Sequence, residues 1–180
     1  MSPEKGILTL IRAWKRLHTD WELILVGDGP LMSEIQSLKG ENENIRLLGR
    51  LSSMEVNRIL CEASISVLPS ECYENFPISL LEAMANGLPV VGSRTGGIPE
   101  IIGSSGALFE SGNEQDLAQS LDRLIKDADL RTNLRLLARE RYLKHYSPEA
   151  NGAQLEAIYS KAIHSHRSRR TASENSPTTF

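Results

Sequence analysis

Residues 69–100 read PSECYENFPISLLEAMANGLPVVGSRTGGIPE. This stretch predicts, in order, a strand end, a polar loop, a short helix, a strand and a Gly-Gly loop. Pro77 suits the first helical position, where no N–H is needed, and Gly87 suits the position after the last turn. Residues 78–85 are apolar nearly all round, so we expect this helix to be buried on most of its faces.

A single acid, Glu82, lies in the middle of that apolar helix. At about 100° per residue it shares a face with Ile78 and Ala85. A buried carboxylate without a partner is strongly destabilising, and the segment offers no Lys or Arg at a helical spacing from Glu82. Either a distant cation pairs with Glu82, or the acid faces a cavity in which a ligand offers hydroxyl donors.

A second acid, Glu74, precedes the helix by a short loop. Glu82 lies roughly 7–8 Å further along the helix axis than the helix start. Carboxylates accept hydrogen bonds from vicinal hydroxyls, whereas the exposed N–H groups of a helix N-terminus favour an anion. The pattern predicts a receptor for a ligand that combines a sugar, a diphosphate and a ribose.

The segment from Glu74 to Glu82 resembles the E-x7-E signature of the family 4 retaining glycosyltransferases, which have the GT-B fold. The likeness continues through LEAMA-x-G-x-PVV and GGIPE, and upstream through GDGP at residues 27–30 and PEKG at residues 3–6. It covers most of residues 3–160. E-x7-E alone is a weak pattern, but the ordered set of motifs is specific.

The resemblance implies a role for several residues in binding a nucleotide-sugar donor. Glu74 would face the donor sugar and act as the catalytic candidate, and Glu82 would bind the ribose diol. The plain alternatives are a solvated loop acid for Glu74, a salt bridge for Glu82 and an ordinary surface lysine for Lys5. We expect the Phe76 side chain to pack in the core. The implied donor-binding residues are Lys5, Gly29, Arg50, Leu51, Asn75, Phe76, Pro77, Ile78 and Glu82.

Two departures from the family pattern affect these assignments. Pro77 stands where the family often has Gly, and proline has no N–H to donate, which would shift the sugar preference. Lys5 resembles the second basic residue of the family's Arg-x4-Lys diphosphate clamp, but the Arg would fall before Met1. A single lysine binds phosphate as a point charge, with less geometric selectivity than arginine.

Short apolar runs alternate with helical patterns along the chain, which predicts an α/β fold: a Rossmann-like, doubly wound parallel sheet flanked by helices. Ligands bind such sheets at the carboxyl ends of the strands, where the turn at Gly27 and the loop at Glu74 are expected. Residues 1–164 would form this domain, and the polar segment 165–180 would be disordered. Strands are expected at 22–26, 45–48, 65–68, 90–91 and 107–109, and helices at 7–17, 31–38, 52–63, 117–125, 130–142 and 153–163.

One strand of the family's sheet has no counterpart in the sequence. In the resembling family a strand precedes the segment that aligns with residues 3–5, and the first strand of a doubly wound sheet is central. Its loss would leave two half-sheets with unpaired edges or force the gap to close. We therefore expect a domain truncated at its N-terminus, a fragment that lacks the acceptor-binding half and is inactive alone.

Composition limits the other function classes. With 180 residues, 40% hydrophobic content and a net charge of −3, the chain suits one domain and not a nucleic-acid surface. Cys61 and Cys72 lack metal-ligand spacing, so no metal is expected and both are read as reduced thiols. Residues 1–5 lack the apolar stretch that is typical of a signal peptide, and no apolar run approaches the roughly 20 residues needed to span a bilayer. The expected location is the cytoplasm or the inner face of the membrane, with any membrane association coming through the missing half.

The leading hypothesis is the donor-binding half of a glycosyltransferase that moves a sugar, with retention, from UDP or GDP to an acceptor. The alternative is a non-catalytic fragment or interaction module that keeps the fold without donor affinity. A third reading, an α/β enzyme such as a sugar-nucleotide epimerase, lacks a recognisable catalytic set. No dinucleotide-binding G-x-G-x-x-G is present, which disfavours a nicotinamide cofactor.

Overall fold

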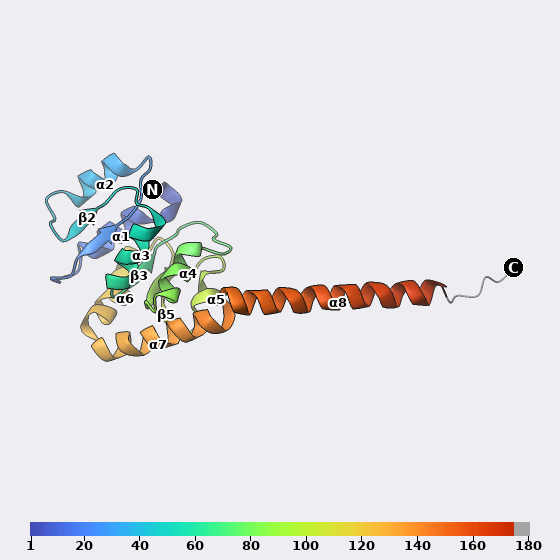
Figure 1. Cartoon of the computed structure of the whole chain (residues 1–180). Coiled ribbons are helices and arrows are strands. Elements are labelled where there is room, and N and C mark those ends of the chain that lie inside the picture. The colour runs from blue at the N-terminus through green and yellow to red at the C-terminus, as the bar shows by residue number, and fades with distance from the viewer. Residues whose placement is uncertain (175–180) are drawn as a thin grey trace. The chain divides into compact units, whose positions relative to one another are not determined.

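A computed structural model describes the backbone of residues 1–174 and the side chains of residues 1–164. The chain divides into two compact units, Met1–Tyr142 and Leu143–Phe180. Helices and strands alternate through the first unit, as Figure 1 shows, and this confirms the predicted α/β class. Its elements are η1 (Pro3–Lys5), α1 (Ile7–Trp14), β1 (Leu23–Leu25), α2 (Met32–Lys39), β2 (Ile45–Leu47), α3 (Ser53–Glu62), β3 (Ser66–Leu68), α4 (Ile78–Ala85), β4 (Val90–Ser93), α5 (Ile98–Ile102), β5 (Gly106–Phe109), α6 (Glu114–Lys126) and most of α7 (Ala128–His145).

The strands of the described residues form two parallel sheets. β1 pairs with β2, with Leu23 opposite Ile45, and β3, β4 and β5 form the second sheet in that order. The order β2-β1 followed by β3-β4-β5 is the doubly wound order 3-2-1-4-5-6 with position 1 vacant. Of the two outcomes considered from the sequence, two half-sheets or a closed gap, the described residues show two half-sheets.

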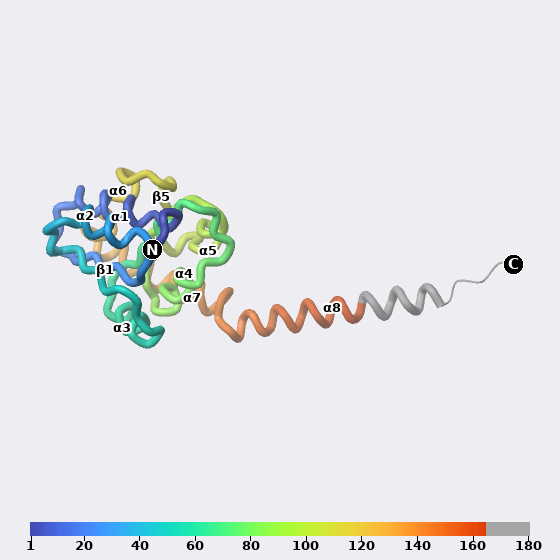
Figure 2. The backbone as a smooth tube through the Cα atoms, turned by 90° about the horizontal axis from the view of Figure 1, so that it is seen from above, coloured from blue at the N-terminus to red at the C-terminus, as the bar shows by residue number. Residues whose placement is uncertain are grey.

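The core lies between the sheets and their covering helices. α1 packs against α2 and α6, and Figure 2 shows α1 and α6 on the same side of the unit. The apolar positions of α1 recur at helical spacing, and its buried residues include Leu10 and Ile11. β4 is buried along its whole length, and Phe109 at the end of β5 is fully buried. Burying each such large side chain contributes about 1.5–3 kcal/mol.

The α4 helix is amphipathic, and our expectation that it is buried on most faces is wrong. Leu80, Ala83 and Met84 are buried, because α4 packs against β3 and β4 on that side. Glu82 is exposed, and Ile78 is 61% exposed. The apolar composition of the helix did not reveal that only one of its faces is covered.

The two ends of α4 are close to their predicted positions. The helix begins at Ile78, so Pro77 is the N-cap residue rather than the first helical residue. Gly87 follows the C-cap residue Asn86 with a positive φ of 68°, a conformation that glycine adopts without steric cost. The predicted role of Gly87 is confirmed.

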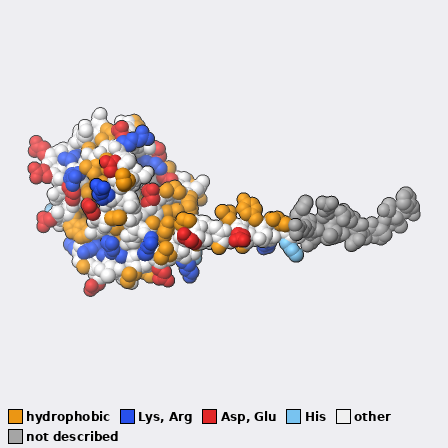
Figure 3. All heavy atoms as spheres, in the orientation of Figure 1, with side chains coloured by type: hydrophobic (Ala, Val, Ile, Leu, Met, Phe, Trp, Pro, Cys, Tyr) orange, Lys and Arg blue, Asp and Glu red, His pale blue; other side chains and the backbone are white. Residues whose placement is uncertain are grey.

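The second unit consists of the end of α7 and the helix α8 (Pro148–Glu174). α8 includes part of the segment 165–180 for which disorder is expected, and residues 175–180 lie outside the described residues. The sequence has no glycine or proline between His164 and Glu174 that would end a helix earlier. Figure 3 shows hydrophobic side chains along the described part of α8. Within the described part of the chain, no helix has the length and apolar character needed to cross a membrane.

The α3 helix begins with a capping box, which the spacing of Ser52 and Glu55 in the sequence predicts, and this box provides a test of the fold. Ser52 accepts from the N–H of Glu55, and the Glu55 carboxylate accepts from the N–H of Ser52 at 2.8 Å. We expect Ser52→Ala to lower the free energy of unfolding by about 1 kcal/mol in urea denaturation. Ser53→Ala, at the adjacent exposed first helical position, serves as the control and should have little effect. Equal losses in the two variants would contradict a specific capping role.

Candidate functional site at the carboxyl edge of the strands

At the carboxyl ends of the strands, the loops after β1 and β3 contact the amino-terminal segment, and the loop after β4 contacts the loop after β3. The N–H of Glu71, in the loop after β3, donates to the carbonyl oxygen of Glu4 at 2.8 Å. The N–H of Gly97, after β4, donates to the carbonyl oxygen of Glu74 at 2.7 Å. The amino group of Met1 donates to the carbonyl oxygen of Asp28, after β1. The structure thus assembles the predicted site from segments that are far apart in sequence.

Two glycines allow these loops to approach one another closely. A Cβ atom at Gly96, which has a φ of +54°, would collide with the backbone of Glu74. A Cβ atom at Gly97 would collide with the carbonyl oxygen of Asn75. The sequence predicts only a Gly-Gly loop at this point. In the structure, the missing side chains let this loop pack directly on the backbone of the Glu74 loop and fix its position.

Lys5 and Glu74, 69 positions apart, form an ion pair, with Lys5 Nζ 2.5 Å from Glu74 Oε1. The hydroxyl of Ser70 donates to the same oxygen at 3.1 Å. The Glu74 side chain is 17% exposed and that of Lys5 is 47% exposed. The hydrogen bond from Lys5 lowers the pKa of Glu74 despite partial burial, and the same bond raises the pKa of Lys5. Both groups therefore stay charged at neutral pH.

This pair predicts a pH-dependent contribution to stability. Glu74 has a depressed pKa when folded, so its contribution is present above the ordinary value of 4.5 and is lost as the pH falls through the lowered pKa. Lys5 has a raised pKa, so its contribution is present below the ordinary value of 10.5 and is lost as the pH rises through the raised pKa. The pair stabilises the fold between these limits.

We expect Lys5→Met to raise the pKa of Glu74 toward its ordinary value, as measured by carbon-13 NMR titration of the carboxyl group. The accompanying loss of unfolding free energy at pH 7 should stay below about 1 kcal/mol, because the pair is partly exposed to water. Lys126→Met removes a different exposed ion pair, with Asp122 at 2.7 Å, and should leave the pKa of Glu74 unchanged. An unchanged Glu74 pKa in Lys5→Met would contradict the pairing.

Glu82 is the fifth residue of α4, in the second turn of the helix, and its side chain is exposed. Among the residues that the structure describes, no base lies within ion-pair distance of its carboxylate, so the salt-bridge alternative is not supported. Asn86 donates to the backbone carbonyl oxygen of Glu82 at 2.9 Å and leaves the carboxylate oxygens accessible. They can accept hydrogen bonds from the hydroxyls of a ligand.

The loop between Glu74 and α4 presents exposed residues to solvent. Asn75 is exposed, Phe76 is 50% exposed, and Pro77 is buried. Core packing of Phe76 was therefore a wrong expectation, because Phe76 lies ahead of α4 and not on the face that packs on β3 and β4. The N–H of Leu80 donates to the carbonyl oxygen of Pro77 at 3.1 Å, whereas the N–H groups of Ile78 and Ser79, at the start of α4, have no carbonyl partner within the helix and can donate to an anion.

The remaining predicted residues lie at the carboxyl ends of β1 and β2. Arg50 is exposed and Leu51 is half-buried, directly ahead of the Ser52 cap. Gly29 lies against Met1, where a Cβ atom would collide with the amino group of that residue. The N–H of Gly27 donates to the carbonyl oxygen of Gly49 at 2.6 Å, which joins the loops after β1 and β2.

Several supporting residues were not found from the sequence. The hydroxyl of Thr9 donates to Glu71 at 2.5 Å, and the buried hydroxyl of Ser93 donates to the carbonyl oxygen of Ser70 at 2.6 Å. These bonds hold the loop after β3 on α1 and β4. No motif or spacing in the sequence indicates them, because the partners come from separate elements.

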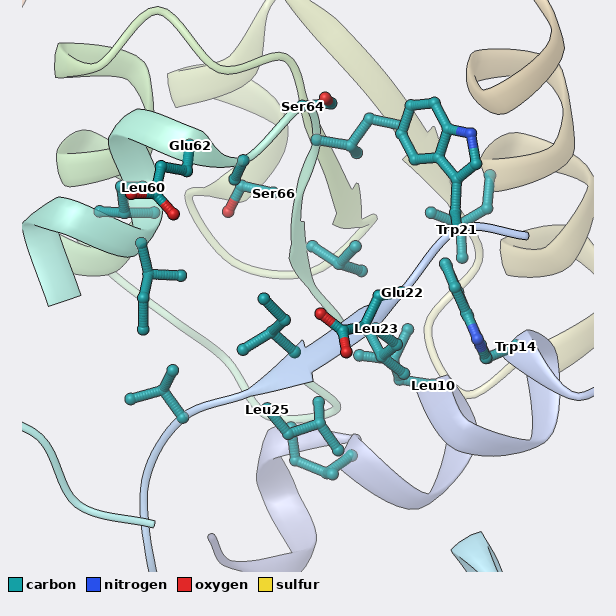
Figure 4. Close-up of a pocket in the computed structure, with 18 of the residues that line it drawn as sticks. Leu10, Trp14, Trp21, Glu22, Leu23, Leu25, Leu60, Glu62, Ser64 and Ser66 are labelled. Carbon is teal, nitrogen blue, oxygen red and sulfur yellow. The ribbon is translucent and has the colours of Figure 1, made fainter. Parts of the chain in front are cut away.

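Arg94, which follows β4, forms an exposed ion pair, with its Nε 3.2 Å from a carboxylate oxygen of Glu110. In the described part of the chain, one cavity lies between β1 and β3 (Figure 4) and another lies beside α2 and β2, and neither of these two is lined by Glu74 or Glu82. Among the described residues, no cluster of three His, Cys, Asp or Glu side chains could hold a metal ion.

Comparison with known proteins agrees with this geometry. The sequence profile of the family described as "Glycosyl transferases group 1" matches residues 1–127. The chain belongs to this family. A relative from Bacillus anthracis, N-acetyl-alpha-D-glucosaminyl L-malate synthase, is 36% identical over 160 residues, which are 86% of this chain and 42% of the relative. The MMP alpha-(1->4)-mannosyltransferase of Mycolicibacterium hassiacum is 34% identical over 170 residues, 89% of this chain and 41% of the relative.

Solved structures share the fold. The C-terminal domain of the group 1 protein LpcC from Francisella tularensis superposes with a TM-score of 0.74 at 26% identity, covering 82% of this chain and 83% of that domain. HepE from Anabaena, in complex with UDP and glucose, gives a TM-score of 0.80 at 24% identity, covering 89% of this chain and 46% of HepE. The chain thus has the fold of the C-terminal half of a GT-B glycosyltransferase, and it spans less than half the length of the curated relatives described above.

Proposed function

We propose that this domain binds a nucleoside diphosphate sugar at the carboxyl edge of its strands and forms the donor half of a retaining glycosyltransferase. The observation that carries the proposal is the contact of Lys5 with Glu74 beside the N-terminus of α4. A cation, a carboxylate and the backbone N–H groups of Ile78 and Ser79 converge there from segments far apart in sequence. This is the set of groups that a sugar diphosphate requires.

The geometry supports a role for each group. Lys5 and the first N–H groups of α4 bind the diphosphate, and Glu74 accepts hydrogen bonds from the donor sugar. The exposed carboxylate of Glu82 binds the ribose diol. The main chain at Arg50 and Leu51 meets the base. Asn75 and Phe76 contact the ligand through their backbone, and the ligand approaches the backbone closely at Gly29. Pro77 has no N–H, so the loop offers one backbone hydrogen-bond donor fewer at that position.

The relatives support the class of donor. HepE was solved with UDP and glucose, and the names of two curated relatives specify an N-acetylglucosaminyl transfer and a mannosyl transfer. Because these sugars differ, we propose a nucleoside diphosphate sugar as the donor and do not name the sugar.

Catalysis would then be electrostatic. Lys5 and the N-terminus of α4 stabilise the negative charge that develops on the departing diphosphate. When the donor binds, Lys5 exchanges its Glu74 partner for a phosphate oxygen, and the freed Glu74 carboxylate faces the positive charge near the anomeric carbon. We assign no side chain as a nucleophile.

Isothermal titration calorimetry with UDP and with GDP tests the proposal. We expect one of the two to bind more tightly than about 1 mM and Lys5→Ala to weaken that binding, because Lys5 contacts the diphosphate. Lys126→Ala, which removes an exposed lysine of α6, should not change the affinity. If neither nucleotide binds the wild-type domain, the interaction-module alternative is favoured instead.

We also expect the isolated domain to be inactive as a transferase, because the acceptor would be held by a separate domain. The purified chain should release no nucleoside diphosphate from UDP-glucose or GDP-mannose above the uncatalysed rate in a coupled assay. Turnover at enzyme-like rates with any simple acceptor would contradict this division of labour.

A further inference from the structure

Ser70, in the loop after β3, is fully buried, and its hydroxyl donates to Oε1 of Glu74 at 3.1 Å. The same oxygen accepts from Lys5 Nζ at 2.5 Å and from the thiol of Cys72, a weak donor, with Sγ at 3.9 Å. All three donors share Oε1, so Oε2 takes part in none of these bonds. The Glu74 carboxylate is thus held through one of its two oxygens.

Ser70 is itself held by the strands next to β3. Its carbonyl oxygen accepts from the hydroxyl of Ser93, the last residue of β4, at 2.6 Å. It also accepts from the hydroxyl of Ser111, in the loop after β5, at 3.3 Å. Ser93 is fully buried, like Ser70, so water does not compete for their hydrogen bond. The second sheet therefore fixes the residue that donates to Glu74.

The backbone on both sides of Ser70 is also fixed. The carbonyl oxygen of Pro69 lies so close to Gly6 that a Cβ atom at Gly6 would collide with it. On the other side, the N–H of Glu71 donates to the carbonyl oxygen of Glu4 at 2.8 Å. The Ser70 hydroxyl therefore stays in place when the side chain of a neighbouring residue moves.

Lys5 is free to move in a way that Ser70 is not. Its side chain is partly exposed, and a lysine ammonium group is carried on a flexible aliphatic stem. Binding of the donor diphosphate requires Lys5 to exchange Glu74 for a phosphate oxygen. A glutamate side chain that loses its partner has several rotamers available to it. After this exchange, the hydrogen bond from Ser70 is the one that keeps the Glu74 carboxylate in one orientation.

We propose that Ser70 is a positioning residue, which keeps the Glu74 carboxylate directed at the donor sugar after Lys5 has moved to the diphosphate. This inference rests on the proposed binding of a nucleoside diphosphate sugar. Ser70 contacts no ligand in this role and acts only through Glu74. Its contribution therefore concerns the sugar and not the nucleotide.

Ser70→Ala, which removes only the hydroxyl, tests the proposal by isothermal titration calorimetry. The affinity for UDP-glucose or GDP-mannose, whichever the wild type binds, should fall by about 3–10-fold, as expected for the loss of one hydrogen bond. The affinity for the corresponding nucleoside diphosphate should not change. A merely structural role would lower both affinities together, and that result, or an unchanged affinity for the sugar nucleotide, would overturn the proposal.

Ser105→Ala is the matched control, because it removes another buried serine hydroxyl, which donates to the carbonyl oxygen of Ile102 at 2.7 Å. Ser105 precedes β5 and so lies at the opposite, amino-terminal end of the strands. This variant should keep both affinities, and a selective loss of sugar-nucleotide binding equal to that of Ser70→Ala would overturn the assignment. If Ser70→Ala does not fold, Ser70→Cys supplies a weaker donor at the same place and should show the same selective loss at a smaller size.

The ligand-free protein gives a second readout, since Lys5→Met reproduces the departure of Lys5. Hydrogen bonds from Lys5 and from Ser70 both lower the pKa of Glu74. Adding Ser70→Ala to Lys5→Met should therefore raise the pKa of Glu74 further in a carbon-13 NMR titration. An unchanged pKa would show that the Ser70 bond does not persist without Lys5, and would overturn the proposal.

The titrations also separate this inference from the proposed function. If the wild-type chain binds neither nucleoside diphosphates nor their sugar derivatives, the proposed function and the role of Ser70 fail together. If the wild type binds a sugar nucleotide and Ser70→Ala binds it equally well, the role of Ser70 fails and donor binding stands.

Discussion

Gly96→Ala is expected to lower the free energy of unfolding by about 2–5 kcal/mol and to abolish binding of nucleoside diphosphates. Gly96 has a positive φ, which a residue with a Cβ atom adopts only with strain. In addition, the new methyl group would collide with the backbone of Glu74, and backbone cannot move aside as the end of a flexible side chain can. The Glu74 loop must shift, and with it the approach to α4.

Gly49→Ala is the matched control for that experiment. Gly49 has a φ of +65°, but a Cβ atom there would have no heavy atom within 4 Å. This variant should therefore show the conformational strain alone, about 1–2 kcal/mol. Urea denaturation of both variants, followed by calorimetric titration, separates strain from collision. Equal losses in the two variants would show that the close approach of the two loops contributes nothing.

Glu82→Gln is expected to weaken binding of the preferred nucleoside diphosphate by roughly 10–100-fold, since hydrogen bonds to a charged group contribute about 1.5–3 kcal/mol. The exposed side chain has no ion-pair partner among the described residues, so the substitution should leave stability unchanged. An unchanged affinity would remove the ribose assignment.

Glu74→Gln provides the complementary measurement on the same site. The resemblance places Glu74 at the sugar and not at the nucleotide, so this variant should keep its affinity for the nucleoside diphosphate and lose affinity for the corresponding sugar nucleotide. In this variant Lys5 has no ion pair with residue 74 that must break before it can bind a phosphate oxygen. Loss of the ion pair should therefore not weaken nucleotide binding. Titrations of both variants with both ligands give four affinities that distinguish the two roles.

Much of the local structure was predictable because it depends on neighbouring residues. The alternation of apolar runs and helical patterns predicted the α/β class, and the Ser52 capping box and the cap at Gly87 were found where expected. These features arise from backbone conformation and hydrogen bonds within a few residues. The short helices η1 and α5 were missed, because one or two turns leave too little periodicity to detect.

Burial was less predictable than secondary structure. Helical spacing shows which residues of α4 share a face, but it does not show which face another element covers. For this reason the exposure of Glu82 and of Phe76 differed from expectation. The motif around Glu74 and Glu82 still led to the correct family, since its residues lie close together in the chain.

The sequence by itself determined the order and type of the elements, the parallel sheet and the family, all of which follow from local patterns and short motifs. Tertiary structure alone decided that Lys5 meets Glu74, that Gly96 lies against the Glu74 backbone, and that the Ser93 hydroxyl donates to Ser70. The physical reason is that these contacts join segments tens of residues apart. Only the packing of helices on the two half-sheets brings such segments together.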